Sequence, residues 1–300
     1  MPDPLAYYAT QSAISDPGKH SGLFDGLPSE LPALCEVVQG LVVHPAWAAQ
    51  YGLTPEQVRE DELQLRFVAP MIERIIELDD RPLTAARPPE TKLAGNCRDH
   101  TMLLCSMLRH RGVPARARCG FGAYFLPGRF EDHWVCEHWD AAKQRWRLVD
   151  GQLDAYQRKA LRIEFDTCDV PRDGFIVAGM AWEMCRRGEA DPESFGLSGL
   201  GEHGLWWVRD NLVRDVAAQN KMELLPWDAW GLARGPEYVN LERDTEMLDR
   251  AADLSQRPEA FAELQSIYRD GDGFRVTATI RSMGPGGGRE VAMPAGSTLV

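Results

Sequence analysis

Gly95-Asn96-Cys97-Arg98-Asp99 is the stretch that decides the fold, because these residues mark the start of a helix. Asn96 is a favourable N-cap, since its side chain can accept a hydrogen bond from an otherwise unpaired N–H of the first turn. Side chains of one stripe follow at helical spacing, namely Cys97, Thr101, Leu104 and Leu108. We therefore expect a helix over residues 97–110 that stops at Gly112 and carries Cys97 in its first turn.

Three strands are expected after this helix, over residues 115–125, 133–139 and 145–149. A helix followed by an antiparallel meander is typical of the α+β class. Within the first strand, Arg116 and Arg118 alternate with small residues, which indicates either a solvated strand face or a pair of cations that bind an acidic substrate.

The last two strands predict a hairpin that joins two polar side chains. If His133 lies opposite Asp150, then Trp139 pairs with Gln144 and the turn is Ala141-Ala142. Directly opposed side chains lie about 4.5–5.5 Å apart at Cβ, so the carboxylate would reach the imidazole. Two alanines form a type I′ turn poorly, and we therefore expect a longer loop and a small shift of the register.

The rest of the chain is mainly helical in pattern. The spacing of apolar residues predicts a helix over 31–43, and Thr54-Pro55-Glu56-Gln57 predicts a capping box that starts a second, interrupted by Pro70. Further helices are expected over 175–186 and 206–219, where tryptophans such as Trp206 and Trp207 would anchor a core or line a cleft. The expected regions are an N-terminal arm with helices (1–90), a central α+β core (91–170), a mainly helical extension (171–281, with a strand or ordered tail over 274–281) and a flexible Gly-rich tail (282–300).

The composition excludes several classes of partner. A net charge of −12 and a pI of about 5.1 repel phosphate backbones and anionic lipid, so neither nucleic acid nor a membrane is expected. The N-terminus lacks the basic start and apolar run of a signal peptide, and a cytoplasmic location is expected. Seven scattered cysteines, an odd number, are expected to be reduced thiols.

Cys97 differs from the other cysteines because the helix dipole at its predicted position favours a thiolate, whereas burial opposes it. A histidine partner would resolve this conflict, and His133 is the candidate base. Asp150, at the end of the third strand, is the candidate that orients the imidazole. Alternatives remain: Cys97 could be a buried core thiol, and Asp150 could be a turn residue with Asp154 nearby. A zinc cluster is a further alternative, with the ligands Cys97, His100, Cys105, His110, Cys136 and His138.

These residues together resemble the bacterial transglutaminase-like domain. The resemblance covers about sixty residues and depends on the order of its motifs, which are Gly95-Asn96-Cys97-Arg98-Asp99, Leu108-Arg109-His110-Arg111-Gly112-Val113-Pro114-Ala115-Arg116, Asp132-His133-Trp134 and Trp146-Arg147-Leu148-Val149-Asp150. It implies a papain-like α+β fold, in which a helix bearing the cysteine packs on a small antiparallel sheet. It also implies that Cys97, His133 and Asp150 form the catalytic triad.

The resemblance implies acyl transfer through a Cys97 thioester, with a peptide, protein or small amide as substrate and an amine or water as acceptor. The Cys97 N–H is the expected first oxyanion donor. No cofactor and no metal are expected. An arylamine N-acetyltransferase-like enzyme is an alternative, although Leu93-Ala94-Gly95-Asn96 replaces the Arg-Gly-Gly of that family. A transglutaminase-like binding module without catalysis is the other alternative.

Overall fold

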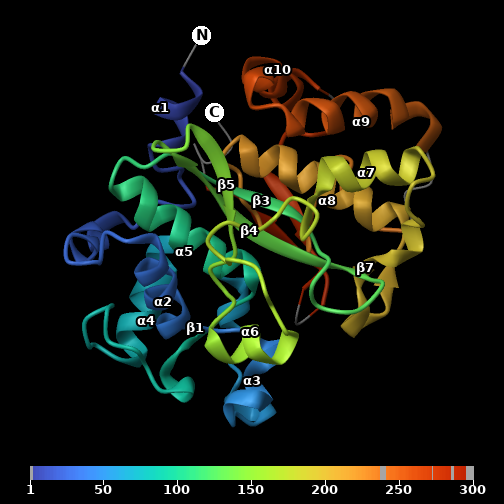
Figure 1. The fold of residues 1–300 in the computed structure, drawn as a ribbon. Helices are drawn as coiled ribbons and strands as arrows, with labels where there is room; N and C mark the ends of the chain where they lie inside the picture. Colours follow the sequence, from blue (N-terminus) through green and yellow to red (C-terminus); the bar gives the residue numbers. More distant parts are fainter. Residues whose placement is uncertain (1–2, 237–240, 272, 285–286, 295–300) are drawn as a thin grey trace. The chain divides into compact units, whose positions relative to one another are not determined.

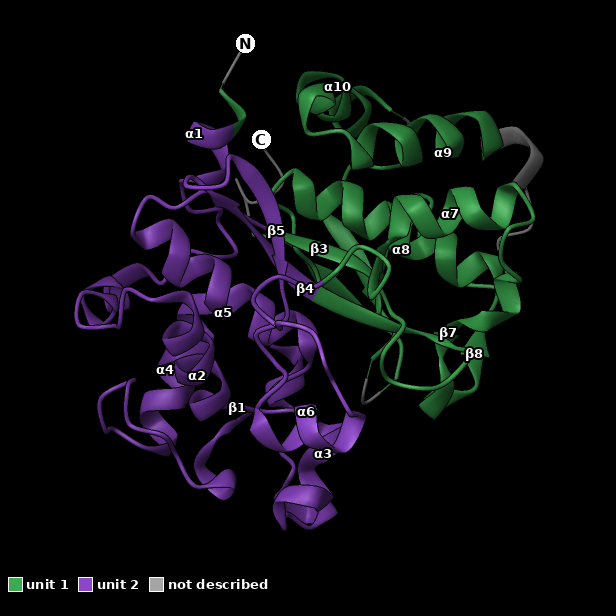
Figure 2. Ribbon diagram, viewed as in Figure 1, with its two compact units in different colours: residues 1–4, 117–134, 171–300 green, residues 5–116, 135–170 purple. Residues whose placement is uncertain are grey.

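The chain forms two compact units in a computed structural model that describes residues 3–236, 241–271, 273–284 and 287–294 (Figure 1). Unit 1 comprises residues 1–4, 117–134 and 171–300, and unit 2 comprises residues 5–116 and 135–170 (Figure 2). The boundaries between the units fall inside two strands, β3 (Ala115–Gly122) and β4 (Phe130–Asp140). Both units combine helices with mainly antiparallel strands, which confirms the α+β class.

Unit 2 is built around α5 (Cys97–His110), whose bounds match the predicted helix. Its other elements are α1 (Pro4–Tyr8), α2 (Leu31–Leu41), α3 (Pro45–Ala48), α4 (Val68–Leu78), α6 (Ala155–Leu161), β1 (Val42–Val43), β2 (Leu93–Ala94) and β5 (Arg145–Val149). The helices α2 and α4 pack against α5, and the Cys105 and Cys136 sulfurs lie 3.4 Å apart between α5 and β4. A helix that starts at Cys97 therefore packs on the antiparallel β4–β5 pair, as predicted.

Every residue of α5 from Cys97 to Arg109 is buried. The predicted stripe would bury only one face of the helix, so the sequence pattern underestimated its burial. The reason is the polar residues on the other faces, which find partners inside the unit. Arg109, for example, donates to the carbonyl oxygen of Ala115 and to the hydroxyl of Ser15, at 2.9 Å in each case.

The start of α5 is fixed by a reciprocal cap. Asn96 Oδ1 accepts the N–H groups of Arg98 (2.9 Å) and Asp99 (3.3 Å), and Asp99 Oδ2 accepts the Asn96 N–H (2.9 Å). The predicted N-cap is thus confirmed, with Asp99 completing a capping box. Gly95 is required before it, because a Cβ at this position would lie 2.8 Å from Val42 Cγ1.

Asp99 also belongs to a buried ion pair. The Arg98 side chain is 0% exposed and donates to Asp99 Oδ1 at 3.0 Å and to the Arg66 carbonyl oxygen at 2.5 Å. Burial raises the pKa of Asp99 to about 6, although the Arg98 guanidinium and the Asn96 N–H favour its charged form.

Unit 1 combines a sheet with a layer of helices. Its strands follow the order β6-β3-β4-β7-β8, and a second, three-stranded sheet has the order β11-β10-β9. The elements of this unit not yet given are α7 (Ala178–Arg186), α8 (Leu205–Gln219), α9 (Leu241–Gln256), α10 (Phe261–Asp270), β6 (Phe175–Val177), β7 (Phe195–Leu197), β8 (Glu202–His203), β9 (Asp228–Ala229), β10 (Thr279–Ser282) and β11 (Arg289–Ala292). The helices α7, α8 and α9 pack on one another, and α10 packs on α9 (Figure 1).

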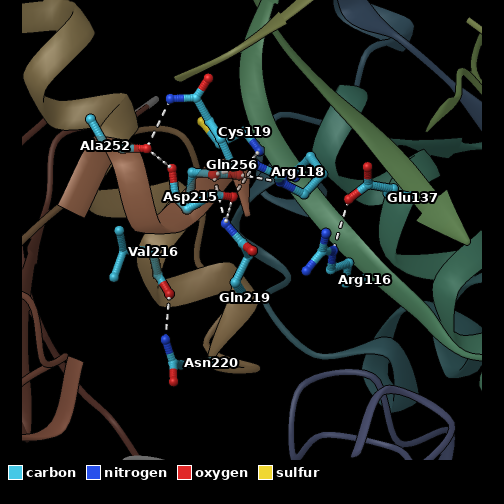
Figure 3. A network of polar contacts seen from close by, with 11 residues as sticks. Arg116, Arg118, Cys119, Glu137, Asp215, Val216, Gln219, Asn220, Ala252 and Gln256 are labelled. Atoms are coloured by element: carbon cyan, nitrogen blue, oxygen red, sulfur yellow. Dashed lines mark hydrogen bonds and ion pairs between the residues drawn. The ribbon is translucent and has the colours of Figure 1, made fainter. Parts of the chain in front are cut away.

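Asp215 of α8 joins this helix layer to β3. Arg118 donates to both carboxylate oxygens of Asp215 at 2.9 Å, and the Cys119 N–H and the Gln219 amide donate to the same carboxylate at 2.9 and 3.0 Å (Figure 3). Asp215 is completely buried. In unit 2, Arg116 is likewise buried and donates to Glu137 at 2.8 Å. Both arginines are buried and ion-paired, so the predicted solvated strand face is wrong.

Two predicted helices differ from the structure. The Thr54 N–H donates to Gln57 Oε1 at 2.8 Å, as predicted, but the helix ends after the single 3₁₀ turn Pro55–Gln57. A new helix, α4, begins at Val68 because Pro70 is compatible only with a first turn. Residues 175–177, predicted as helix, form the strand β6 instead. They pair with β3 at Gly120, where the absence of a side chain lets the two backbones approach closely. A Cβ on Gly120 would lie 2.3 Å from the Ile176 carbonyl oxygen.

The predicted Gly-rich tail contains a strand. Residues 289–292 form β11, which pairs with β10, and residues 285–286 and 295–300 of the tail lie outside the described residues. The described part of the chain contains no helix that is both long and apolar enough to span a bilayer.

Replacing Asp215 by Ala should lower the free energy of unfolding by about 3–5 kcal/mol, because Arg118 would keep its charge without its buried partner. The control is Asp253→Ala, which breaks the exposed pair between Asp253 of α9 and Arg257 just after it, and should cost about 0.5 kcal/mol or less. Urea titration followed by circular dichroism measures both values, and equal losses would contradict this role of Asp215.

Asp99 should make the stability of the chain depend on pH. Because its folded pKa lies above its ordinary value of 3.8, its contribution to stability is complete below about pH 4 and is lost as the pH rises through about 6. Between pH 4.5 and 7, the native chain should therefore lose about 2 kcal/mol relative to Asp99→Asn, which keeps a capping oxygen. Urea titrations of both chains at the two pH values test this, and parallel pH dependences would refute it.

Candidate active site

Cys97 occupies the first position of α5, where the residue is 7% exposed. Asn96 Oδ1 takes up the N–H groups of Arg98 and Asp99, and the Cys97 N–H has no acceptor among the described residues. A helix start also carries the positive end of the helix dipole. The backbone around Cys97 is therefore prepared to stabilise negative charge on the sulfur or on a nearby oxygen.

Asp150 directly follows β5, is 1% exposed and is held by backbone bonds in unit 2. Its N–H donates to the Thr167 carbonyl oxygen at 2.9 Å, and its Oδ1 accepts the Gln152 N–H at 3.1 Å. The neighbouring Gly151 packs on Leu104 of α5, where a Cβ would lie 3.1 Å from the Leu104 side chain. The turn that carries Asp150 thus lies against the helix that begins at Cys97, two turns along the predicted stripe.

Asp154, the nearby alternative to Asp150, has a different structural role. Its Oδ1 accepts the Gln157 N–H at 2.8 Å and caps α6, and its Oδ2 accepts the Tyr51 hydroxyl at 2.6 Å. This pattern of bonds is that of an N-cap.

The β4–β5 hairpin has a different register from the predicted one. Trp139 pairs with Trp146 rather than with Gln144, and the loop comprises residues 141–144 instead of two alanines. The pairing of His133 with Asp150 is therefore wrong, because the ladder ends at Cys136 and Val149. The shift is two residues, so no side chain moves to the other face of the strand pair. The longer loop and the register shift were themselves expected.

His133 lies in unit 1, near the start of β4, and is 2% exposed. Aromatic rings surround its imidazole: the ring centroids of Phe125, Tyr124 and Phe175 lie 4.8, 6.2 and 6.3 Å away. The three predicted residues therefore come from two units, with Cys97 and Asp150 in unit 2 and His133 in unit 1.

Asp132 is a residue of this region to which the sequence analysis assigned no role. Its carboxylate accepts Trp207 Nε1 (2.6 Å) and Asn211 Nδ2 (2.9 Å), which lie one turn apart on α8. Burial raises the pKa of Asp132, while Asn211, Arg214, Trp207 and His133 act in the opposite direction. These bonds fix the residue next to His133 to a helix. The four-residue spacing of Trp207 and Asn211 indicates that both side chains lie on one face of a helix. Nothing in the sequence, however, indicates that Asp132 is their acceptor.

The alternative zinc cluster does not form. Among the described residues, no three His, Cys, Asp or Glu side chains are placed to hold a metal ion. His100 Nδ1 lies 2.9 Å from the Asn96 carbonyl oxygen, and His110 Nε2 lies 2.8 Å from Asp25 Oδ1, so both rings have local partners.

The sequence around these residues is similar to a known protein family. The family model of the transglutaminase-like superfamily matches residues 72–151, which include Cys97, His133 and Asp150. No curated protein matches the chain. The chain is also similar to a crystal structure from Cytophaga hutchinsonii named as a candidate cysteine protease, with 15% identity and a TM-score of 0.34. That match covers 59% of this chain and 46% of the other protein. The similarity to this superfamily is confined to residues 72–151, about a quarter of the chain.

Proposed function

We propose that this chain is a cysteine enzyme that transfers or hydrolyses acyl groups through a Cys97 thioester. In this proposal His133 is the base and Asp150 orients it, and the substrate is a peptide, a protein or a small amide. The observation that carries the proposal is the position of Cys97 at a capped helix start inside the segment that matches the transglutaminase-like superfamily.

Three features of the separate residues support these roles. The Cys97 N–H, which has no acceptor among the described residues, can donate to a developing oxyanion. The rings around His133 exclude water from the imidazole, which strengthens its electrostatic interactions. The backbone bonds of Asp150 hold its turn against α5, as an orienting carboxylate requires.

The proposed reaction has two steps. The His133 imidazole takes the thiol proton, and the Cys97 sulfur attacks the carbonyl carbon of the amide, so that a tetrahedral oxyanion forms against the Cys97 N–H. The imidazolium then gives its proton to the departing amine, which leaves a thioester on Cys97. In the second step water or another amine attacks the thioester, its proton passes to His133, and the thiol is restored. Asp150 stabilises the imidazolium in both steps.

Trapping of the acyl-enzyme tests this proposal. The chain is incubated with a panel of glutamine peptides and small amides, and intact-protein mass spectrometry measures the adduct and its release by water or by a labelled amine. Cys97→Ala should abolish both the adduct and turnover, and Asp150→Asn should reduce turnover on the order of 10³- to 10⁴-fold.

Asp154→Asn and Cys185→Ala are the matched controls, because Asn also caps a helix and Cys185 lies in α7 of unit 1. Both should keep native turnover. Full turnover by Cys97→Ala would refute the proposal. The absence of any adduct from a chain whose Cys97 still reacts with a thiol reagent would favour the binding module.

A further inference from the structure

The three aromatic rings around the His133 imidazole differ in their exposure to solvent. Phe175, whose ring centroid lies 6.3 Å away, is completely buried. Phe125 and Tyr124, at 4.8 and 6.2 Å, are half-buried and belong to the loop between β3 and β4. Of the three rings, Phe125 and Tyr124 are thus the ones that a molecule from solvent can touch beside the imidazole.

Gly122, the last residue of β3, makes room for these two rings. A Cβ at Gly122 would lie 2.5 Å from Phe125 Cε2, 2.7 Å from Phe125 Cδ2 and 3.2 Å from Tyr124 Cζ. Carbon atoms that are not bonded to one another pack at about 3.5–4.0 Å, so a side chain here would push the Phe125 ring away. The position of the ring beside His133 therefore depends on the absence of a side chain at Gly122.

The loop that carries the rings is anchored at both ends and exposed at its tip. The Ala123 N–H donates to the Gly174 carbonyl oxygen at 2.8 Å, and the Arg129 guanidinium donates to the Glu193 carbonyl oxygen at 2.8 Å. Between these anchors, Leu126 is 43% exposed. The loop thus holds its two rings at the surface of unit 1, next to the imidazole, rather than in the core.

The proposed reaction brings an amine to the imidazole. His133 gives a proton to the departing amine, and it takes the proton of an amine that attacks the thioester. The substituent of that amine consequently comes within reach of the Phe125 ring. An apolar or aromatic substituent gains contact with the ring, whereas a charged one loses its water there without gaining a hydrogen-bond partner from Phe125.

We propose that Phe125, whose ring centroid lies 4.6 Å from that of Tyr124, determines specificity for the amine side of the substrate. It binds an apolar or aromatic substituent on the amide nitrogen. Secondary amides with such a substituent are then preferred over primary carboxamides, which have no group at this place. The inference rests on the proposed function, because it takes His133 as the residue that meets the amine, but binding of the substituent beside His133 is measured without turnover.

Binding to a chain that cannot form the thioester tests the inference. Cys97→Ala is labelled with carbon-13 at the histidine Cε1 atoms, and the NMR signal of His133 is identified among the seven histidines by its loss when His133→Gln is added. N-benzylacetamide should shift this signal until it saturates, because the benzyl ring is bound beside the imidazole. N-methylacetamide at the same concentration should leave the signal in place.

Variants in the same background locate the contact. Phe125→Ala should weaken the binding of N-benzylacetamide about tenfold, since it removes a contact between two rings and the apolar area that they bury. Phe125→Leu keeps apolar bulk and should weaken binding about threefold. Gly122→Ala should weaken it as well, because the new Cβ displaces the Phe125 ring. Met283→Ala is the matched control: Met283 is a 52% exposed apolar residue of unit 1, and its loss should leave binding unchanged.

Equal binding of the two amides, or unchanged binding of N-benzylacetamide by Phe125→Ala, would overturn the inference. Should Phe125→Ala fail to fold, unchanged binding by Phe125→Leu overturns it instead. These outcomes are separate from those of the acyl-enzyme experiment. A native chain that hydrolyses both amides without preference would keep the proposed function and refute the role of Phe125. A His133 signal that N-benzylacetamide shifts, in a chain that forms no adduct, would refute the function and leave Phe125 as part of a binding site for an apolar amide.

Discussion

The reciprocal cap at the start of α5 is the interaction on which the rest of the core depends. Asn96 and Asp99 satisfy one another's backbone groups, and this allows a helix to begin inside the unit rather than at its surface. Because almost the whole helix is buried, its first residue is buried as well, and Cys97 occupies the position of strongest helix dipole away from bulk water. This arrangement also buries the Arg98–Asp99 ion pair, and the desolvation of these two charges opposes folding.

The sequence predicted correctly those helices and strands whose ends are set by neighbouring residues. The cap before Cys97 and the stop at Gly112 gave the bounds of α5, and the strand 145–149 was also predicted with its observed bounds. Where the cause is distant in the sequence, prediction failed. The register of the β4–β5 hairpin depends on a four-residue loop, and residues 175–177 form a strand only because β3 presents Gly120 to them.

The same distinction applies to the polar residues. The order of the motifs predicted a resemblance that the family match over residues 72–151 supports, but it did not reveal how the charged groups are arranged in the structure. Arg118 was expected near solvent, although it is matched by Asp215 nearly a hundred residues later. Asp132 received no role because its partners, Trp207 and Asn211, lie on α8. Buried polar groups require partners, and the identity of a remote partner is set by packing rather than by local pattern.

The central claim is that His133 activates the sulfur of Cys97, and the rate of Cys97 alkylation measures this most directly. Iodoacetamide is applied at pH 6.5 to the native chain and to His133→Gln, and mass spectrometry follows each cysteine with time. Cys185 serves as the internal reference. We expect Cys97 to react faster than any other cysteine of the native chain, and at least about tenfold more slowly in His133→Gln, while Cys185 is unchanged. Equal Cys97 rates in the two chains would contradict the account.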